Sequence, residues 1–225
     1  MTGEPAEWQT RADELAAEAV GAGEPTAWFE QLYAEGVSGA ATLAWDRAEP
    51  NPLLVQWATA HNTQGAGHRA VVVGAGLGAD AAYLVGLGFE TIAFDISPTA
   101  VAIASERVGG PHVKFVTADL LALPPQWRQA FGLVVEIYTI QALPRSLREK
   151  ATQAVGQLVA SGGTLVVIQA ELSHGESPTD GPPWPLTRNE IEAFAADSLT
   201  RVRIDQVEDA ANPAVRRWLA EFTRR

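Results

Sequence analysis

The chain has 225 residues, of which 47% are hydrophobic and none is cysteine. This length can bury the core of one full domain but leaves no room for a second, separate substrate domain. The lack of cysteine excludes disulfides and cysteine metal sites, and the four histidines show no metal-ligand spacing. A net charge of −11 without a basic run argues against nucleic acid as a partner. No apolar run reaches eighteen residues and the start is polar, so we expect a cytoplasmic protein without membrane contact.

Helical patterns dominate the beginning of the chain. We expect one amphipathic helix over residues 5–20 and a second over 26–34. A third should begin at Asn51-Pro52, where an N-cap residue precedes a proline. We predict that residues 1–65 form a helical cap ahead of a core of residues 66–225, all within one domain. The cap is expected to be either a lid over a ligand or a plain cover for one face of the core.

Strand and helix patterns alternate through the core, which favours a doubly wound α/β fold. The expected strands cover residues 71–73, 91–94, 113–116, 131–137 and 164–169, the last after a turn at 161–163. The helices between them cover 79–87, 98–108 and 144–160. A capping box at 187–190 opens a last helix over 190–196, and strands over 200–207 and 215–222 should form a hairpin at the sheet edge. We therefore predict a Rossmann-like, seven-stranded sheet that is mostly parallel and ends in an antiparallel hairpin.

A glycine-rich turn after the first strand carries the strongest functional signal. Gly74, Gly76 and Gly78 let the backbone turn tightly and approach a ligand without a Cβ in the way. Asp95 ends the second strand about twenty residues later, where an acid binds the two ribose hydroxyls of an adenosine. The glycine pattern fits both dinucleotide-binding proteins and S-adenosylmethionine (SAM) methyltransferases. The turn therefore predicts a nucleotide-type cofactor without naming it.

Acidic residues near the ends of the third and fourth strands help to separate these two cofactors. Asp119, followed by the apolar Leu120, suits the amino group and face of an adenine. Methyltransferases of the Rossmann-like class carry an acid there, whereas dinucleotide enzymes often do not. Glu136 lies near the end of the fourth strand, which should lie beside the first at the switch point where ligands bind. The pattern favours SAM.

At these residues the chain resembles the class I SAM-dependent methyltransferases, and within that class it is similar to the thiopurine and thiol/halide methyltransferase group. Upstream of the turn, the resemblance rests on Trp28, Tyr33, Gly36, Trp45-Asp46 and Pro50–Leu54. Downstream, it rests on Glu136–Leu143 and on Gly181-Pro182-Pro183-Trp184. The similarity covers roughly residues 25–222. The chain departs from the group at Tyr33, where a second tryptophan is usual, at Ala48, commonly glycine, and at Gly132, often aspartate.

The resemblance implies SAM as the cofactor and a small molecule as the methyl acceptor, with sulfur, a ring heteroatom or a halide as the methylated atom. The residues expected to bind the cofactor are Trp28, Tyr33, Gly74, Ala75, Gly76, Gly78, Asp80, Asp95, Ile96, Asp119, Leu120 and Glu136. Those expected at the acceptor are Trp45, Tyr138, Gln141 and Trp184. No residue stands out as a general base, and a thiolate or halide acceptor needs none.

Two other functions stay open at this point. A short nicotinamide-dependent oxidoreductase would fit the glycine pattern, but its usual Tyr-x-x-x-Lys pair is missing, since Tyr138 is followed by Ala142 at that spacing. A non-catalytic protein that binds SAM or a related nucleoside would carry the same cofactor residues.

Overall fold

The computed structural model of the protein describes residues 7–43, 45–172, 181–209, 212 and 215–225. In this part of the chain, seven strands form one sheet in the order β3-β2-β1-β4-β5-β7-β6. The strands are β1 (Arg69–Val73), β2 (Glu90–Asp95), β3 (Val113–Thr117), β4 (Phe131–Ile137), β5 (Val159–Ala170), β6 (Leu199–Glu208) and β7 (Arg216–Arg224). Strands β1 to β5 are parallel, and β7 is antiparallel to both of its neighbours. The predicted doubly wound, mostly parallel sheet is confirmed.

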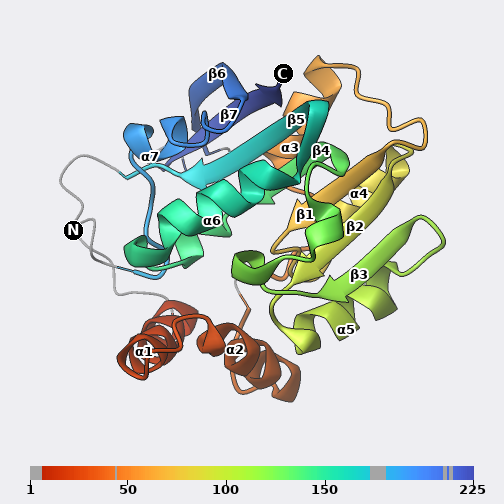
Figure 1. Ribbon diagram of the computed structural model, residues 1–225. Helices are drawn as coiled ribbons and strands as arrows, with labels where there is room; N and C mark the ends of the chain where they lie inside the picture. The colour runs from red at the N-terminus through yellow and green to blue at the C-terminus, as the bar shows by residue number, and fades with distance from the viewer. Residues whose placement is uncertain (1–6, 44, 173–180, 210–211, 213–214) are drawn as a thin grey trace.

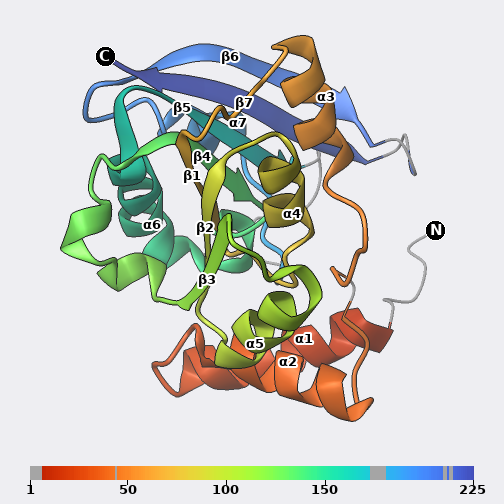
Figure 2. The ribbon, with the colours of Figure 1, turned by 90° about the vertical axis from the view of Figure 1, so that its right-hand side faces the viewer.

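Helices cover both faces of the sheet (Figure 1, Figure 2). One face carries α6 (Arg145–Leu158) and α7 (Arg188–Glu192), and the other carries α3 (Pro52–Ala60), α4 (Ala79–Gly86) and α5 (Pro98–Val108). Helices α1 (Glu7–Gly21) and α2 (Ala27–Ser38) lie below the carboxyl ends of the parallel strands. The short helices η1 (Leu120–Ala122), η2 (Pro125–Trp127) and η3 (Ile140–Ala142) were not predicted. None of the helices within the described ranges has the length and apolar character needed to cross a membrane.

The central strands are buried on both faces, which explains their continuous apolar runs. Val71 and Val73 of β1 belong to the hydrophobic cluster beneath α6, whereas Ala70 and Val72 belong to the cluster beneath α3 and α4. Successive side chains of a strand point to opposite faces, so each face receives every second residue. Packing between the two helical layers places the carboxyl ends of the parallel strands together at one end of the sheet. Helices α1 and α2 cover this end.

Helix α3 packs on the sheet and not over its end. The Asn51 side chain accepts a hydrogen bond from the Leu53 N–H at 2.9 Å, as expected for an N-cap. Leu54 and Trp57 are buried in the cluster shared with β1 and α4. Within the predicted cap of residues 1–65, it is therefore α1 and α2 that cover the end of the sheet.

Several predicted boundaries differ from the structure. Helix α2 continues to Ser38, and α7 begins directly after its Thr187 cap and ends at Glu192. Strand β5 begins at Val159, so the expected turn at 161–163 lies inside it. There the register with β4 shifts, which makes the turn a bulge within the strand.

The predicted C-terminal hairpin forms, but only one of its strands lies at the sheet edge. Strand β7 lies between β5 and β6 and pairs with both of them. Trp218 and Phe222 of β7 are buried in the cluster beneath α6. We interpreted the charges in both strands as a sign of exposed edges. That interpretation holds for β6 and is wrong for β7.

Candidate functional site

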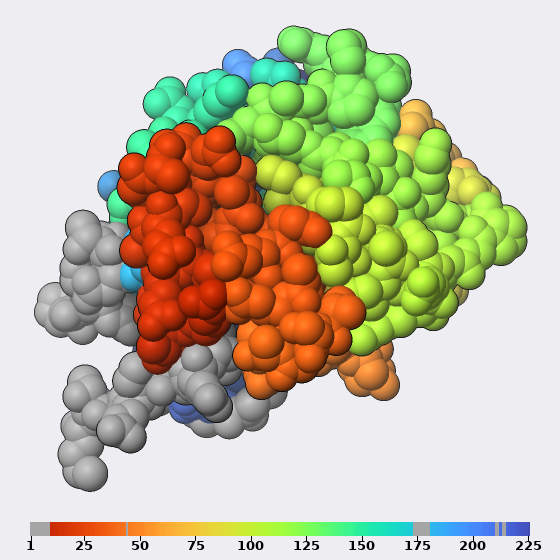
Figure 3. All heavy atoms as spheres, turned by 90° about the horizontal axis from the view of Figure 1, so that it is seen from below, coloured from red at the N-terminus to blue at the C-terminus, as the bar shows by residue number. Residues whose placement is uncertain are grey.

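A cavity of about 260 Å³ lies between the carboxyl ends of the strands and helices α1 and α2. Seen from that end, α1 and α2 lie across the molecule beside the segments that follow β2 and β3 (Figure 3). Most of the residues that the sequence singled out line this cavity: Trp28, Tyr33, Trp45, Gly74, Ala75, Gly76, Gly78, Asp80, Asp95, Ile96, Asp119, Leu120, Tyr138 and Gln141. Glu136 and Trp184 do not. The structure thus brings the glycine turn, three acids and the aromatic residues of the cap together around one space.

The glycine turn needs glycine for two different reasons. Gly74 and Gly76 have φ angles of 60° and 52°, which L side chains rarely adopt. A Cβ on Gly74 would lie 2.3 Å from the Thr139 Oγ1 atom, so the segment after β4 packs against the turn there. A Cβ on Gly76 would lie 3.2 Å from the Tyr33 hydroxyl, on the cavity side. Gly76 therefore keeps the floor of the cavity open.

Asp95 both fixes the turn and faces the cavity. Its carboxylate accepts hydrogen bonds from the Gly76 N–H at 2.9 Å and from the Ser97 N–H at 3.0 Å. Burial raises the pKa of Asp95 above its ordinary value, and these backbone hydrogen bonds offset part of that effect. Each carboxylate oxygen can accept a further hydrogen bond, so Asp95 can still bind hydroxyl groups of a ligand.

Tyr33 and Trp45 form a pair over the turn. The Trp45 Nε1–H donates a hydrogen bond to the Tyr33 hydroxyl at 2.8 Å, and the two rings meet edge to face at 6.0 Å. Burial, together with the nearby Asp95 carboxylate, holds the pKa of Tyr33 well above its usual range. An indole can only donate, so a tryptophan at position 33 could not accept this hydrogen bond. The departure at Tyr33 thus has a structural reason.

Glu30, which sequence reasoning missed, ties the cap to the core. Its carboxylate accepts hydrogen bonds from the hydroxyls of Ser97 and Thr99 and from the Thr99 N–H, at the start of α5. Burial would raise the pKa of Glu30, but these hydrogen bonds outweigh it and keep the pKa below its ordinary value. Glu30 lies three residues before Tyr33, which places both on the same face of α2. The sequence feature that could have identified Glu30 is an acid three residues before Tyr33 on a helix face rich in aromatic residues.

Asp80 and Asp119 line the cavity but also hold the backbone around it. Asp80 accepts a hydrogen bond from the Asn51 N–H at 2.7 Å, and burial raises its pKa. Asp119 caps η1 by accepting from the Leu121 N–H at 2.8 Å. The two acids thus help to shape the wall that they belong to.

Glu136, which we expected to contact the cofactor, is not among the residues that line the cavity. It is fully buried, and one of its oxygens accepts from the N–H groups of Thr139 and Ile140 at 2.9 and 3.0 Å. The Gln169 amide donates to both oxygens. Glu136 therefore turns back under the end of β4 and fixes the segment that carries Tyr138 and Gln141.

Replacing Glu136 with glutamine is expected to change how stability depends on pH. Burial raises the Glu136 pKa from 4.5 to about 7, so its ionisation opposes folding increasingly as the pH rises from 4.5 to 7. That shift corresponds to about 3 kcal/mol of stability, present below pH 4.5 and lost above pH 7. Urea unfolding should show wild type losing about this much stability relative to the variant between pH 4 and pH 8. An equal difference at both pH values would contradict the assignment.

Trp184, which we expected at the acceptor, is not among the residues that line the cavity. Its N–H donates a hydrogen bond to the Gln141 carbonyl at 2.7 Å, and its ring packs against the cluster formed by α1 and α2. The two residues before it, Pro182 and Pro183, line the cavity in its place. The predicted loop is therefore part of the site, but through its prolines.

Tyr138 and Gln141 form the wall beyond the end of β4. Arg217 lies over the Tyr138 ring at 5.5 Å. The Gln141 side-chain oxygen accepts a hydrogen bond from the Ala170 N–H at 2.6 Å. The backbone N–H of Gln141 donates to the side-chain oxygen of Gln169 at 3.2 Å. One of the four histidines, His174, lies outside the described residues. Among the residues that are described, no group of three or more His, Cys, Asp or Glu side chains is arranged to hold a metal ion.

Comparisons with known proteins identify relatives of this chain. Thiopurine S-methyltransferases from Aliivibrio fischeri (strain ATCC 700601 / ES114) and Aliivibrio salmonicida (strain LFI1238) are 27% and 24% identical over 95 residues. These alignments span 42% of this chain and 43%, less than half, of the relatives' own length.

Solved structures of methyltransferases share the fold. N-methyltransferase NodS from Bradyrhizobium japonicum WM9, in complex with S-adenosyl-l-homocysteine (SAH), is 19% identical with a TM-score of 0.63, over 86% of this chain and 97% of that one. The 1,6-didemethyltoxoflavin-N1-methyltransferase of Burkholderia thailandensis is 17% identical with a TM-score of 0.67, over 100% and 93%. A profile of the thiopurine S-methyltransferase family matches residues 28–223. This match spans most of the 225 residues of the chain, so the chain belongs to the thiopurine S-methyltransferase family.

Proposed function

We propose that the protein transfers a methyl group from SAM to a small-molecule acceptor on sulfur, a ring heteroatom or a halide. The observation that carries the proposal is that the glycine turn and Asp95 line the same cavity as the aromatic residues of the cap and Tyr138. The family supports methyl transfer, and two structural neighbours were solved with SAH. The net charge of −11 supports a small acceptor over nucleic acid.

The residues present fit this cofactor. Gly76 leaves open the space that a Cβ would fill beside Tyr33, and Asp95 can accept hydrogen bonds from ribose hydroxyls. Asp119 and Leu120 would hold the adenine, one through its amino group and the other through its face. SAM, when bound, supplies a methyl group on a positively charged sulfur, which is already electrophilic.

The residues of this chain would then have to position the acceptor and exclude water. Trp28, Tyr33 and Trp45 cover the cavity from the cap, and Tyr33 stays neutral because its pKa is raised. The cavity lining includes no histidine or lysine among the described residues, and Asp95, Asp80 and Asp119 already accept hydrogen bonds from backbone N–H groups. An acceptor that is already ionised would need none of them as a base. Alignment of two reactants supplies much of the barrier reduction in such reactions.

A thermal-denaturation panel with SAM, SAH, NAD and NADP tests the choice of cofactor. A ligand of the folded state stabilises it by roughly 2.7 kcal/mol at a hundredfold excess over its dissociation constant. We expect SAM and SAH to raise the melting temperature and the dinucleotides to leave it unchanged. A shift with NAD and none with SAM would refute the proposal.

Replacing Tyr138 with phenylalanine is expected to lower the methylation rate by less than the roughly 100- to 10,000-fold typical of losing a general acid or base. The ring that lines the cavity is retained, and positioning rather than proton transfer is the expected task of this wall. Steady-state rates, with SAM affinity from calorimetry as the control, measure the effect. A larger loss at unchanged SAM affinity would identify a proton-transfer group and indicate an amine or hydroxyl acceptor.

A further inference from the structure

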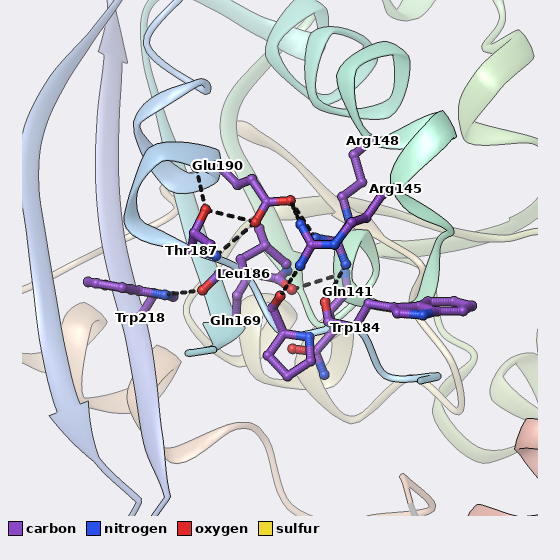
Figure 4. A network of polar contacts seen from close by, with 10 residues as sticks. Gln141, Arg145, Arg148, Gln169, Trp184, Leu186, Thr187, Glu190 and Trp218 are labelled. Carbon is purple, nitrogen blue, oxygen red and sulfur yellow. Dashed lines mark hydrogen bonds and ion pairs between the residues drawn. The ribbon is translucent and has the colours of Figure 1, made fainter. Parts of the chain in front are cut away.

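We infer that Arg148 of α6 is a positioning residue for the methyl acceptor, because it holds the segment 182–184 that walls the cavity. Arg148 is 5% exposed and extends from α6 toward that segment (Figure 4). One guanidinium nitrogen donates to the Trp184 carbonyl, and another lies 2.6 Å from a carboxylate oxygen of Glu190. The inference rests on the proposed function, since it concerns the acceptor side of the same cavity.

The Trp184 main chain is held from two sides. Its N–H donates to the carbonyl of Gln141, which lines the cavity, and its C=O accepts from Arg148. Pro182 and Pro183 directly precede it and form part of the wall. A shift of this carbonyl would therefore move the prolines relative to Gln141 and change the shape of the space that an acceptor fills.

Glu190 fixes the orientation of the Arg148 guanidinium. One Glu190 oxygen contacts Arg145 and Arg148, and the other accepts from the N–H and hydroxyl of Thr187 at 2.8 and 2.9 Å. Burial would raise the pKa of Glu190, but hydrogen bonds from Thr187 and the two arginines lower it to about 2. Glu190 is therefore ionised at neutral pH, and the clamp formed by Arg148, Glu190 and Trp184 persists there.

Burying Arg148 costs free energy, so stability alone does not explain the clamp. Burial lowers the pKa of Arg148, and its Nε atom is buried without a hydrogen-bond partner. Apolar side chains of similar volume often replace a buried ion pair at no cost to stability. Downstream, Leu186 is held independently, by the Ala170 carbonyl at 2.9 Å and the Trp218 Nε1–H at 2.8 Å. Loss of the clamp should thus act locally on residues 182–184.

Amide hydrogen exchange, measured by NMR, tests the clamp without an assay of activity. In Arg148→Met, the Trp184 N–H should exchange at least about tenfold faster, because its opening becomes easier. The exchange rate of the Leu186 N–H, which donates a hydrogen bond to the Ala170 carbonyl, should not change. Arg145→Met is the matched control, since Arg145 shares Glu190 but reaches the Pro185 carbonyl, at 3.2 Å. Equal exchange of the Trp184 N–H in wild type and Arg148→Met would overturn the inference.

Steady-state kinetics with thiophenol as the acceptor tests the consequence for the site. Arg148→Met should raise the KM for thiophenol by about tenfold while kcat changes much less and the SAH dissociation constant stays constant. Arg145→Met is again the control, because it removes the other arginine at Glu190 but leaves the Arg148–Trp184 contact. A rise in KM as large in Arg145→Met would overturn the positioning role. A wild type that neither binds SAH nor methylates thiols would instead contradict the proposed function, and the exchange result would still decide the clamp.

Discussion

Replacing Asp95 with alanine is expected to raise the dissociation constant for SAM by about 10- to 150-fold, the effect of losing hydrogen bonds to a charged group. Asp95 lies at the end of β2 and lines the cavity beside the glycine turn. Alanine would remove the oxygens that we expect to accept from the ribose. It would also remove the contacts with Gly76 and Ser97, so some loss of stability should accompany the loss of affinity.

Isothermal titration calorimetry measures this change, and thermal unfolding shows whether the variant is folded. Asp119→Ala is the matched control and should have a smaller effect, because Leu120 still offers an apolar wall to the adenine. Burial raises the Asp95 pKa above 3.8, so SAM affinity should begin to fall at a higher pH than for an exposed aspartate as the pH is lowered. Unchanged affinity in a folded Asp95→Ala would mean that Asp95 serves only the turn.

Deleting residues 1–46 is expected to abolish turnover, with a loss of more than the roughly 100-fold that a misplaced substrate causes. The deletion would remove α1, α2 and the Tyr33–Trp45 pair, and with them one wall of the cavity. Water would then reach the reacting atoms, and the acceptor would lose contacts that align it. Rates with a thiol acceptor measure the effect, and circular dichroism checks the fold. A folded deletion variant that still methylates would show that the helices are a plain cover.

Glu30→Ala tests the same idea with a single change. It removes the hydrogen bonds from Ser97 and Thr99 that tie α2 to the start of α5, and it should lower both turnover and SAH affinity. Glu24→Ala is the matched control, because Glu24 is an exposed acid in the turn between α1 and α2. Equal behaviour of the two variants would contradict a role for Glu30 in closing the cap.

The elements with local signals could be predicted from the sequence. Runs such as Val71–Val73 indicate buried parallel strands on their own, and Gly74, Gly76 and Gly78 mark a turn because glycine adopts positive φ angles at no steric cost. Asn51 and Ser97 indicate helix starts, because both are favoured N-cap residues. In the structure, each side chain accepts a hydrogen bond from a backbone N–H in the first turn of its helix. These signals involve neighbours along the chain, so one sequence suffices to read them.

The parts that could not be predicted depend on contacts between distant segments. Nothing near Glu136 in the sequence shows that it turns back to meet Gln169, 33 positions later, instead of facing the cavity. The order of β7 and β6 follows from pairing with β5, which alternation alone does not reveal. Likewise, Arg148 and Trp184 lie 36 positions apart and meet only once α6 has packed on the sheet.

Methyl transfer itself is the most direct test of the proposed function. Wild-type protein should be incubated with isotopically labelled SAM and separate small acceptors: thiols, iodide, phenols and aromatic heterocycles. We expect SAH and a methylated small molecule to form in equal amounts with at least one of these classes. Tight SAM binding without SAH formation in any of them would contradict a methyltransferase and favour a non-catalytic protein that binds SAM.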